Sequence, residues 1–520
     1  MLARLIEPYY GTRLYRKLIG NTPAEPPVFP LPAPLGGNPA QAERLLTGEL
    51  SFGGQTILNP VPLCYPPHAT PAWRRELGCF AWVRDLHAQG SGTARRVAQL
   101  MVQRWLAEDD QFQGEAWRLD LVARRLATLL LFYTYLDDGT AEGRLVLLQG
   151  VARHDGHLRH ALPGGLGRIA LAQAAVSLIL TGMLLPRRQA SLRRGLQIFK
   201  RALGLWGGEE PFGQRNGTAL LDLLELLGAV MLAARLSGRS VPEIVRVAGE
   251  RLAATIAVLI HADGTLAQFH GARADDPARI RAILATFAPH PGTEAAHFQR
   301  LQAGRSTVIL DVGAPPADAA AHSSPLAFEF SHDGEKIVTN CGACDRSAEW
   351  QIASRHAAAH SVLILNGQDG MALPVYSQAM APHVLCRRDE NQGRIWVDAH
   401  HQGYHEHLGA EVRRRLYLDQ DGQDLRGEDI VTGPSGLSFV IRFHLMPEID
   451  AVLARDGFSV LLTCPSGRAF RLRTSQGPLR LEDSFYCADG LNVWKSRQLT
   501  VMGASQEGET RVLWALSREA

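Results

Sequence analysis

From Trp73 to about Ile260, apolar residues recur at the three-to-four-residue spacing of amphipathic helices. Examples of such helical segments, separated by Gly, Asp and Pro, are 94–107, 116–136, 166–185, 189–205, 219–236 and 241–260. Consecutive helices joined by short connections, with no strand between them, predict helix pairs stacked side by side. Segment 219–236 is apolar on most faces, so neighbouring helices must cover it. A toroid of helical hairpins satisfies both conditions.

Near residue 304 the pattern changes to short β-branched or aromatic runs bounded by Gly, Asp or Pro. These strand-length runs are 306–313, 326–331, 336–342, 361–367, 394–401, 412–419, 437–445, 458–467, 469–475 and 510–516. So many short strands in succession predict a large antiparallel β-sandwich. The predicted fold is therefore an α+β multidomain chain, in which an N-terminal α/α toroid precedes a β-sandwich. Its predicted domains are an irregular arm at 1–72, the toroid at 73–299 and the sandwich at 300–520.

The remaining composition narrows the class of protein. Residues 21–39 contain seven prolines and predict an extended arm. Lys and Arg total 54 against 52 Asp and Glu, so no global charge favours nucleic acid, and an acidic substrate would need a local basic cleft. Of seven cysteines only Cys341 and Cys344 form a CxxC, which predicts small buried residues rather than a zinc site or a disulfide framework.

No targeting or membrane segment is predicted. The first twenty residues are basic and lack a long apolar core, so they do not resemble a signal peptide. Residues 169–185 are uncharged, but Gln173, Ser177 and Thr181 recur every four residues and place a polar stripe on one helix face. We therefore expect a packed helix and a cytoplasmic protein, with the periplasm as the open alternative.

Several strings resemble the bacterial heparinase II/III-like proteins. They are RLQAGRSTVILDVGAPP at 300–316, SPLAFEFSHDGEKIVTNCG at 324–342, RHAAAHSVLILNG at 355–367, HQGYHEHLGAEVRRRLYLDQDGQDLRGED at 401–429 and VIRFHLMPEID at 440–450. The helical half matches more loosely, at 73–90, 214–217 and 261–271. The resemblance implies a toroid followed by a sandwich, and a polysaccharide lyase that cleaves uronic-acid-containing polymers by elimination.

Such a lyase removes the C5 proton of a uronic acid and expels the oxygen at C4. The reaction requires neutralisation of the carboxylate, a base for the C5 proton and an acid for the leaving oxygen. Amide, Arg, His and Tyr side chains suffice, so we expect no cofactor.

The resemblance assigns the catalytic roles to His360, His270 and Asn216, with Arg215, Arg355 and Tyr404 in substrate binding. His360 matches the family's sandwich histidine, which points into the cleft between domains; the alternative is a structural histidine. Arg215 and Asn216 resemble the loop that holds the uronate carboxylate, although Asn216-Gly217 is also a turn pair.

His270 lies where the family usually supplies a proton-transferring tyrosine, and this chain has none between Tyr135 and Tyr376. Either His270 replaces that tyrosine, or Tyr404 reaches the site, or the protein is not an efficient lyase. We expect His360 to approach Arg215, Asn216 and His270 to within roughly 6–12 Å, the width of one sugar.

Metal binding is a weaker prediction. His356, four residues from His360, would lie about 13 Å away on a strand, too far for both to bind one ion. His400, His401, His405 and His407 form a dense cluster, and a structural divalent metal near His401 and His405 is the alternative to solvated histidines.

Two other functions stay open. A toroid-type glycoside hydrolase would need two facing carboxylates, for which the candidates are Asp155, Glu209, Glu210 and Asp263. A non-catalytic glycan-binding or envelope-polysaccharide assembly protein could keep the architecture without the tyrosine.

Overall fold

The computed structural model describes most of the chain. The described residues are Tyr10, Thr12, Leu14, Tyr15, Ile19, 22–61, 63, 66–108, 114–204, 215–290, 292–316, 320–371, 373 and 384–519. They form two compact units, each discontinuous in sequence. The helical unit comprises Met1–Gly207, Leu221–Ala253 and Arg281–Ala288, and the β unit comprises Gly208–Leu220, Ala254–Ile280 and Pro289–Ala520.

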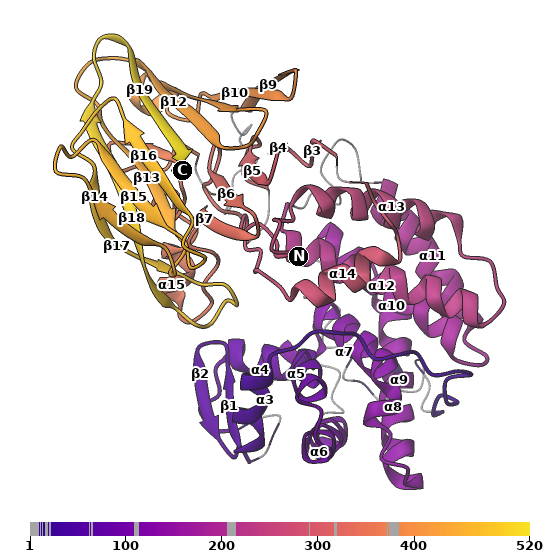
Figure 1. Ribbon diagram of the computed structural model, residues 1–520. Coiled ribbons are helices and arrows are strands. Elements are labelled where there is room, and N and C mark those ends of the chain that lie inside the picture. The colour runs from indigo at the N-terminus through magenta and orange to yellow at the C-terminus, as the bar shows by residue number, and fades with distance from the viewer. Residues whose placement is uncertain are drawn as a thin grey trace. The chain divides into compact units, whose positions relative to one another are not determined.

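The helical unit is built from consecutive helices, drawn in indigo to magenta in Figure 1. Helices with residues in it are α3 (Pro39–Leu46), α4 (Pro71–Cys79), α5 (Trp82–Gln89), α6 (Gly92–Glu108), α7 (Leu119–Leu131), α8 (Tyr133–Leu136), α9 (Ala141–Ala161), α10 (Arg168–Leu184), α11 (Gln189–Gly204), α12 (Gly217–Leu236), α13 (Glu243–Val258) and α14 (Pro277–Ala285). A short hairpin of β1 (Glu49–Phe52) and β2 (Gln55–Leu58) accompanies them.

Helices α10 and α11 pack closely because glycines stand at their contact. A Cβ at Gly182 would lie 2.5 Å from the Leu192 Cβ, and one at Gly195 would lie 2.7 Å from the Ala175 carbonyl oxygen. The polar stripe predicted for α10 is internal, since the Ser177 hydroxyl donates to backbone carbonyls within the unit. Among the described helices, none is both long and apolar enough to span a membrane.

The β unit contains two large antiparallel sheets. One has the order β14-β15-β16-β19-β12-β11-β10-β9, formed by β14 (Asp450–Leu453), β15 (Ser459–Thr463), β16 (Ala469–Thr474), β19 (Gly508–Arg518), β12 (Asp424–Gly433), β11 (Glu411–Leu418), β10 (Arg394–His401) and β9 (Val384–Asn391).

The other sheet has the order β17-β18-β13-β7-β6-β5-β4-β3, with β8 paired to β13. Its strands are β17 (Arg480–Tyr486), β18 (Trp494–Ala504), β13 (Ser438–Leu445), β7 (Glu335–Thr339), β6 (Phe328–His332), β5 (Ser306–Asp311), β4 (Phe298–Ala303), β3 (Glu294–Ala295) and β8 (Leu363–Leu365).

Aromatic side chains from both sheets interlock in the core of this sandwich. Phe328 on β6 stacks on Trp514 of β19, with ring centroids 5.5 Å apart. Phe443 on β13 meets the same indole edge-on at 5.0 Å. Inward positions of β11 alternate strictly with outward ones, as a sheet with one buried face requires.

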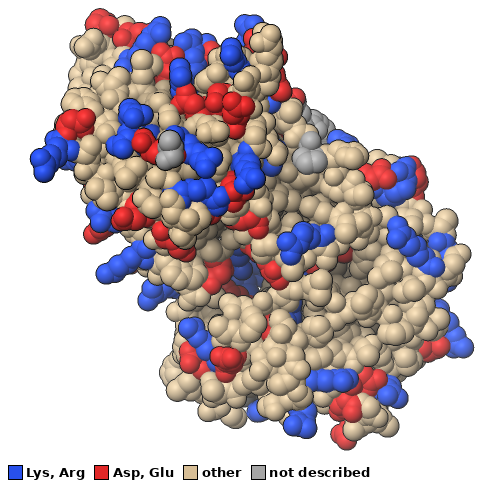
Figure 2. All heavy atoms as spheres, in the orientation of Figure 1, with Lys and Arg blue, Asp and Glu red and all other residues tan. Residues whose placement is uncertain are grey.

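The predicted order of a helical part followed by an antiparallel β-sandwich is confirmed. The toroidal closure of the helices and the domain limits at 72 and 299 stay predictions. Four long polar strands were not predicted, namely β9, β12, β17 and β18. On the face shown in Figure 2, Lys and Arg are interspersed with Asp and Glu, consistent with a net charge of +2.

One local prediction was wrong. His360 does not lie on a strand: Ala357–Ala359 form a 3₁₀ turn, and β8 begins only at Leu363. Because of that turn, the His360 Nδ1 lies 2.9 Å from the His356 carbonyl oxygen, and the estimate of two histidines held apart on a strand does not apply.

Candidate active site

Asn216 lies at the start of α12 within the β unit. Its side-chain oxygen accepts a hydrogen bond from the Ala219 N–H at 3.0 Å and so caps the helix. Its side-chain nitrogen faces Gly271, where an added Cβ would lie 3.0 Å from it. Gly271 has φ of +82°, a conformation that favours glycine, so this residue lets the loop after His270 approach Asn216.

Arg215 is fully buried and heavily engaged. Its guanidinium donates to the backbone carbonyls of Ala296, His297 and Ala314, each at 3.0 Å. It also pairs with the Asp311 carboxylate. A substrate carboxylate would have to compete with these partners, so in this structure Arg215 acts as an internal anchor, and its role in substrate binding stays a prediction.

Asp311, at the end of β5, collects donors from several segments. Besides Arg215, it accepts hydrogen bonds from the Gly313 N–H at 3.0 Å and the Ser324 hydroxyl at 2.8 Å. The His270 Nε2 lies 3.0 Å from its second oxygen. Burial alone would raise the pKa of this carboxyl, but Arg215 and His270 outweigh burial and hold the pKa below its usual value. Asp311 is therefore ionised.

The orientation of the His270 ring follows from its neighbours. Its Nδ1 accepts a hydrogen bond from the His322 backbone N–H at 3.2 Å, and its Nε2 lies 3.0 Å from both the Asp311 carboxylate and the Arg215 Nη1. His270 has φ of +49°, which places it in a tight turn. The Asp311 carboxylate thus fixes the orientation of the His270 ring.

His322 and His360 form a direct imidazole pair. The His322 Nδ1 lies 3.1 Å from the His360 Nε2, and the rings meet edge-on with centroids 5.2 Å apart. Because the His356 carbonyl accepts from His360 Nδ1–H, the His360 Nε2 must accept from His322 Nδ1–H. The His322 Nε2 is therefore unprotonated, and within the described part of the chain it has no hydrogen-bond donor.

Both imidazoles are neutral at ordinary pH. Burial lowers the pKa of His360 to about 4. Burial, followed by the nearby His360 and His270, lowers the pKa of His322 well below its ordinary value. A neutral imidazole can accept a proton, but it cannot neutralise a substrate carboxylate. The pair is thus suited to act as a base.

Arg355 makes hydrogen bonds to the backbone on both sides of His322. Its Nε donates to the Ala321 carbonyl at 2.9 Å, and its own carbonyl accepts the Ser323 N–H at 2.8 Å. These hydrogen bonds of Arg355 are therefore to the backbone on either side of His322, and its role in substrate binding stays a prediction.

Tyr404 is not brought into this network. Its buried hydroxyl donates to the Gln368 carbonyl at 2.9 Å and accepts the Leu365 N–H at 3.3 Å. Neither His322 nor His360 hydrogen-bonds to a tyrosine hydroxyl in the described part of the chain.

The histidine cluster at 400–407 has no common focus. His401 is buried, and its Nδ1 accepts the Gly403 N–H, whereas His405 and His407 lie at the surface. No set of three or more His, Cys, Asp or Glu side chains suited to a metal ion occurs among the described residues. The prediction that no cofactor is needed is untested.

The structure thus places four of the predicted residues in one part of the β unit: Arg215, Asn216, His270 and His360. Asp311 and His322, which the sequence analysis did not single out, link three of them: Arg215, His270 and His360. Asp311 lies near the end of the predicted run at 306–313, and His322 lies in an alanine- and serine-rich loop without periodicity. Only the spacing of His322 shortly before a predicted strand could have drawn attention to it.

Residues 288–515 match the family described as heparinase II/III-like, C-terminal. The chain therefore contains a heparinase II/III-like C-terminal domain, and the resemblance inferred from the sequence is confirmed.

Solved structures show the same fold over the whole chain. A crystal structure of heparinase III aligns with a TM-score of 0.70 and 14% identity, over 99% of this chain and 89% of that one. The heparan sulfate lyase HepC of Pedobacter heparinus gives a TM-score of 0.58 at 12% identity, over 92% and 82%. The chondroitin AC lyase of Streptomyces coelicolor gives 0.54 at 10%, over 93% and 78%.

One characterised relative bears a different kind of name. FtsZ-localized protein C of Caulobacter vibrioides is 29% identical over an alignment of 523 positions. The alignment covers 92% of this chain and 88% of that protein. The fold is thus that of polysaccharide lyases, and the chain is also similar to a protein named for its localisation.

Proposed function

We propose that this protein is a polysaccharide lyase that cleaves a uronic-acid-containing acidic polysaccharide by β-elimination. The observation that best supports the proposal is the His322–His360 pair, in which a neutral imidazole ends in an unprotonated nitrogen. Elimination needs such a base for the C5 proton of the uronic acid.

In the proposed reaction, the His322 Nε2 takes the C5 proton, and the positive charge is shared with His360 across their hydrogen bond. The C5–H electrons form the C4–C5 double bond as the C4–O4 bond breaks. The same proton then passes from His322 to the leaving O4, so the pair returns to its neutral state. One imidazole would thereby serve as base and acid, which removes the need for the missing tyrosine.

Asn216 is the group we assign to the uronate carboxylate. Its amide nitrogen lies beside Gly271, next to His270, while its oxygen is committed to the helix cap. An amide donor aimed at a developing enolate lowers the barrier because charge accumulates there only in the transition state. His270 is held by Asp311 and accepts a hydrogen bond from the His322 backbone N–H, and through this bond it would orient His322.

The direct test is incubation of the purified chain with a panel of polygalacturonate, alginate, hyaluronan, chondroitin sulfate and heparan sulfate. A C4–C5 unsaturated product absorbs in the ultraviolet, whereas a hydrolysis product does not. Absence of the absorbance rise for all of these polymers would count against the lyase proposal.

A second candidate is a non-catalytic glycan-binding or envelope-assembly protein. It is favoured by the near-complete burial of His322 and His360, at 2% and 1% exposure, and by the missing tyrosine. The similarity to FtsZ-localized protein C is compatible with such a role. Retention on immobilised acidic glycans without an unsaturated product would support this candidate.

The hydrolase alternative has less support. Asp155 is buried and paired with Arg159 and Arg188, and Asp263 accepts hydrogen bonds from Thr265. Glu209 and Glu210 lie outside the described residues. The cytoplasmic localisation stays a proposal as well.

A further inference from the structure

Ser361, the residue after His360, is tied to the surrounding strands by its backbone and side chain. Its N–H donates to the Asn340 side-chain oxygen at 3.0 Å, and its hydroxyl donates to the Thr339 carbonyl at 2.6 Å. Its carbonyl accepts from Arg414 at 2.8 Å. Because the peptide bond between His360 and Ser361 is planar and rigid, the position of Ser361 restricts the position of the His360 backbone.

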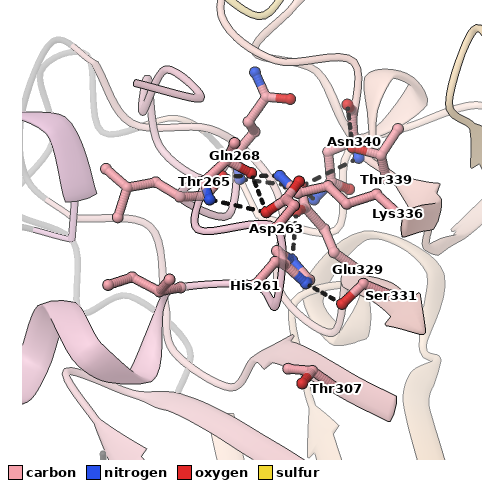
Figure 3. A network of polar contacts seen from close by, with 12 residues as sticks. His261, Asp263, Thr265, Gln268, Thr307, Glu329, Ser331, Lys336, Thr339 and Asn340 are labelled. Carbon is pink, nitrogen blue, oxygen red and sulfur yellow. Dashed lines mark hydrogen bonds and ion pairs between the residues drawn. The ribbon is translucent and has the colours of Figure 1, made fainter. Parts of the chain in front are cut away.

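Asn340 transmits this restraint to a second segment. Its side-chain nitrogen donates to the Glu329 Oε1 at 3.1 Å. The same Glu329 oxygen accepts the Gln268 N–H at 3.0 Å, and Gln268 precedes His270 by two residues. Figure 3 shows Gln268, Glu329 and Asn340 within one network of polar contacts. One carboxylate oxygen therefore joins the segments that carry His270 and His360.

Glu329 is held in its charged form. It is fully buried, the Lys336 Nζ lies 3.8 Å from it, and the His261 Nε2 lies 3.0 Å from it. Burial alone would raise the pKa of Glu329, but Lys336 and His261 outweigh burial and lower it. The Lys336 ammonium is itself fixed by the Leu266 carbonyl at 3.0 Å. A charged acceptor makes stronger hydrogen bonds than a neutral one, so the restraint is firm.

We propose that Glu329 and Asn340 are positioning residues of the candidate active site, which set the spacing between the His270 loop and the His360 turn. They touch neither the reacting atoms nor the imidazole rings of His270, His322 and His360 in this structure; they act through the backbone. The inference rests on the proposed lyase function for its kinetic consequence, but its geometric consequence is independent of catalysis.

The central variant is Asn340→Ala, which removes the link to Ser361 and leaves the Glu329–Lys336 ion pair intact. Its matched control is Ser331→Ala. The Ser331 hydroxyl lies 2.8 Å from the His261 Nδ1, so this change deletes one buried hydrogen bond of the same network and leaves both Asn340 side-chain bonds in place. Both variants should lower the melting temperature, Asn340→Ala by more, because it deletes two hydrogen bonds.

We expect Asn340→Ala to reduce kcat about 100-fold with KM within twofold, because a displacement near 1 Å costs about that much. Ser331→Ala should stay within threefold of the wild type. In parallel, nuclear magnetic resonance of histidine-labelled full-length chain should show His360 resonances changed in position or line width by Asn340→Ala and unchanged by Ser331→Ala.

The double variant Glu329→Gln/Asn340→Asp provides the rescue. It exchanges the amide and the carboxylate, so an acceptor for the Ser361 N–H is restored, whereas the Gln268 N–H loses the oxygen to which it donated. We expect it to restore the wild-type His360 resonances but not the His270 resonances, and it can replace Asn340→Ala if that variant does not fold.

Equal kinetic and spectral effects of Asn340→Ala and Ser331→Ala, or no recovery in a folded double variant, would overturn the proposal. If the wild type produces no unsaturated sugar, the lyase function fails, and the His360 resonances alone decide whether these residues position the ring.

Discussion

The helical unit and the β unit each bury an arginine beside a histidine, but the other groups that bind the arginine differ between the two units. In the helical unit, Arg125 donates through Nε to the His154 Nε2 at 2.8 Å and through its other nitrogens to the carbonyls of Gly78 and Ala116. In the β unit, the Arg215 charge is balanced by the Asp311 carboxylate.

The two histidine systems differ in what remains available. The His154 Nδ1 lies 2.7 Å from the Gly150 carbonyl, so both of its ring nitrogens have partners. The series of hydrogen bonds that begins at Arg215 ends instead at the His322 Nε2, which lacks a hydrogen-bond donor within the described residues. A fully satisfied histidine stabilises a fold, whereas an imidazole with an unprotonated, unengaged nitrogen can do chemistry.

The largest effect should come from removing either ring of the pair. We expect His322→Ala and His360→Ala to lower the rate of unsaturated-product formation by about 10²–10⁴-fold, the usual worth of a positioned acid–base group. Initial rates from ultraviolet absorbance measure this. Activity retained in both folded variants would show that the pair is not the base.

Asp311→Asn should affect the stability of the β unit most. The change leaves the Arg215 guanidinium buried without its counter-charge, so we expect the free energy of unfolding to fall by about 3–5 kcal/mol. Urea denaturation of the full chain tests this, with Asp263→Asn as the half-buried carboxylate control. A loss as small as that of the control would mean that the backbone carbonyls alone satisfy Arg215.

Asn216→Ala should weaken catalysis without unfolding the protein. Loss of one preorganised donor lowers kcat by about 10²–10³-fold, and loss of the helix cap costs about 1 kcal/mol of stability. Asn216→Ser separates the two roles, because serine keeps a capping oxygen and lacks the amide. Full activity in the serine variant would remove Asn216 from the carboxylate site.

His154→Phe tests the other side of the comparison. It leaves the Arg125 Nε without its acceptor, so we expect the free energy of unfolding to fall by about 1–3 kcal/mol. The rate of elimination should stay at the wild-type value. A selective loss of rate with unchanged stability would contradict the structural role of this histidine.

The smallest change in rate and stability is expected between pH 7 and 8, where both rings of the His322–His360 pair are already neutral. The pKa of His360 is lowered from 6.5 to about 4 in the folded chain. Between these two pH values, His360 therefore binds a proton in the unfolded chain but not in the folded chain. This contribution to stability is complete above pH 6.5 and is lost as the pH falls toward 4. The rate profile should therefore lack an inflection near 6.5, and an inflection there that persists at full folding would show an exposed, ordinary imidazole.

The type and order of the elements could be predicted from the sequence. The predicted run at 394–401 coincides with β10 (Arg394–His401), and the predicted helix at 219–236 lies within α12 (Gly217–Leu236). Apolar periodicity records which face of a local element is buried, and that information is contained in neighbouring residues. Polar strands such as β12 were missed because their pairing partners, and not their own composition, make them strands.

The site was only partly predictable. Resemblance supplied His360, His270 and Asn216, but it placed His360 on a strand and gave Arg215 a role in binding substrate. That His322 lies between His270 and His360, and that Asp311 holds Arg215 and His270 together, was decided by tertiary structure. The residues concerned are up to 145 positions apart, from 215 to 360. Hydrogen bonds across such separations depend on how strands pair and turns close, which no local pattern along the chain encodes.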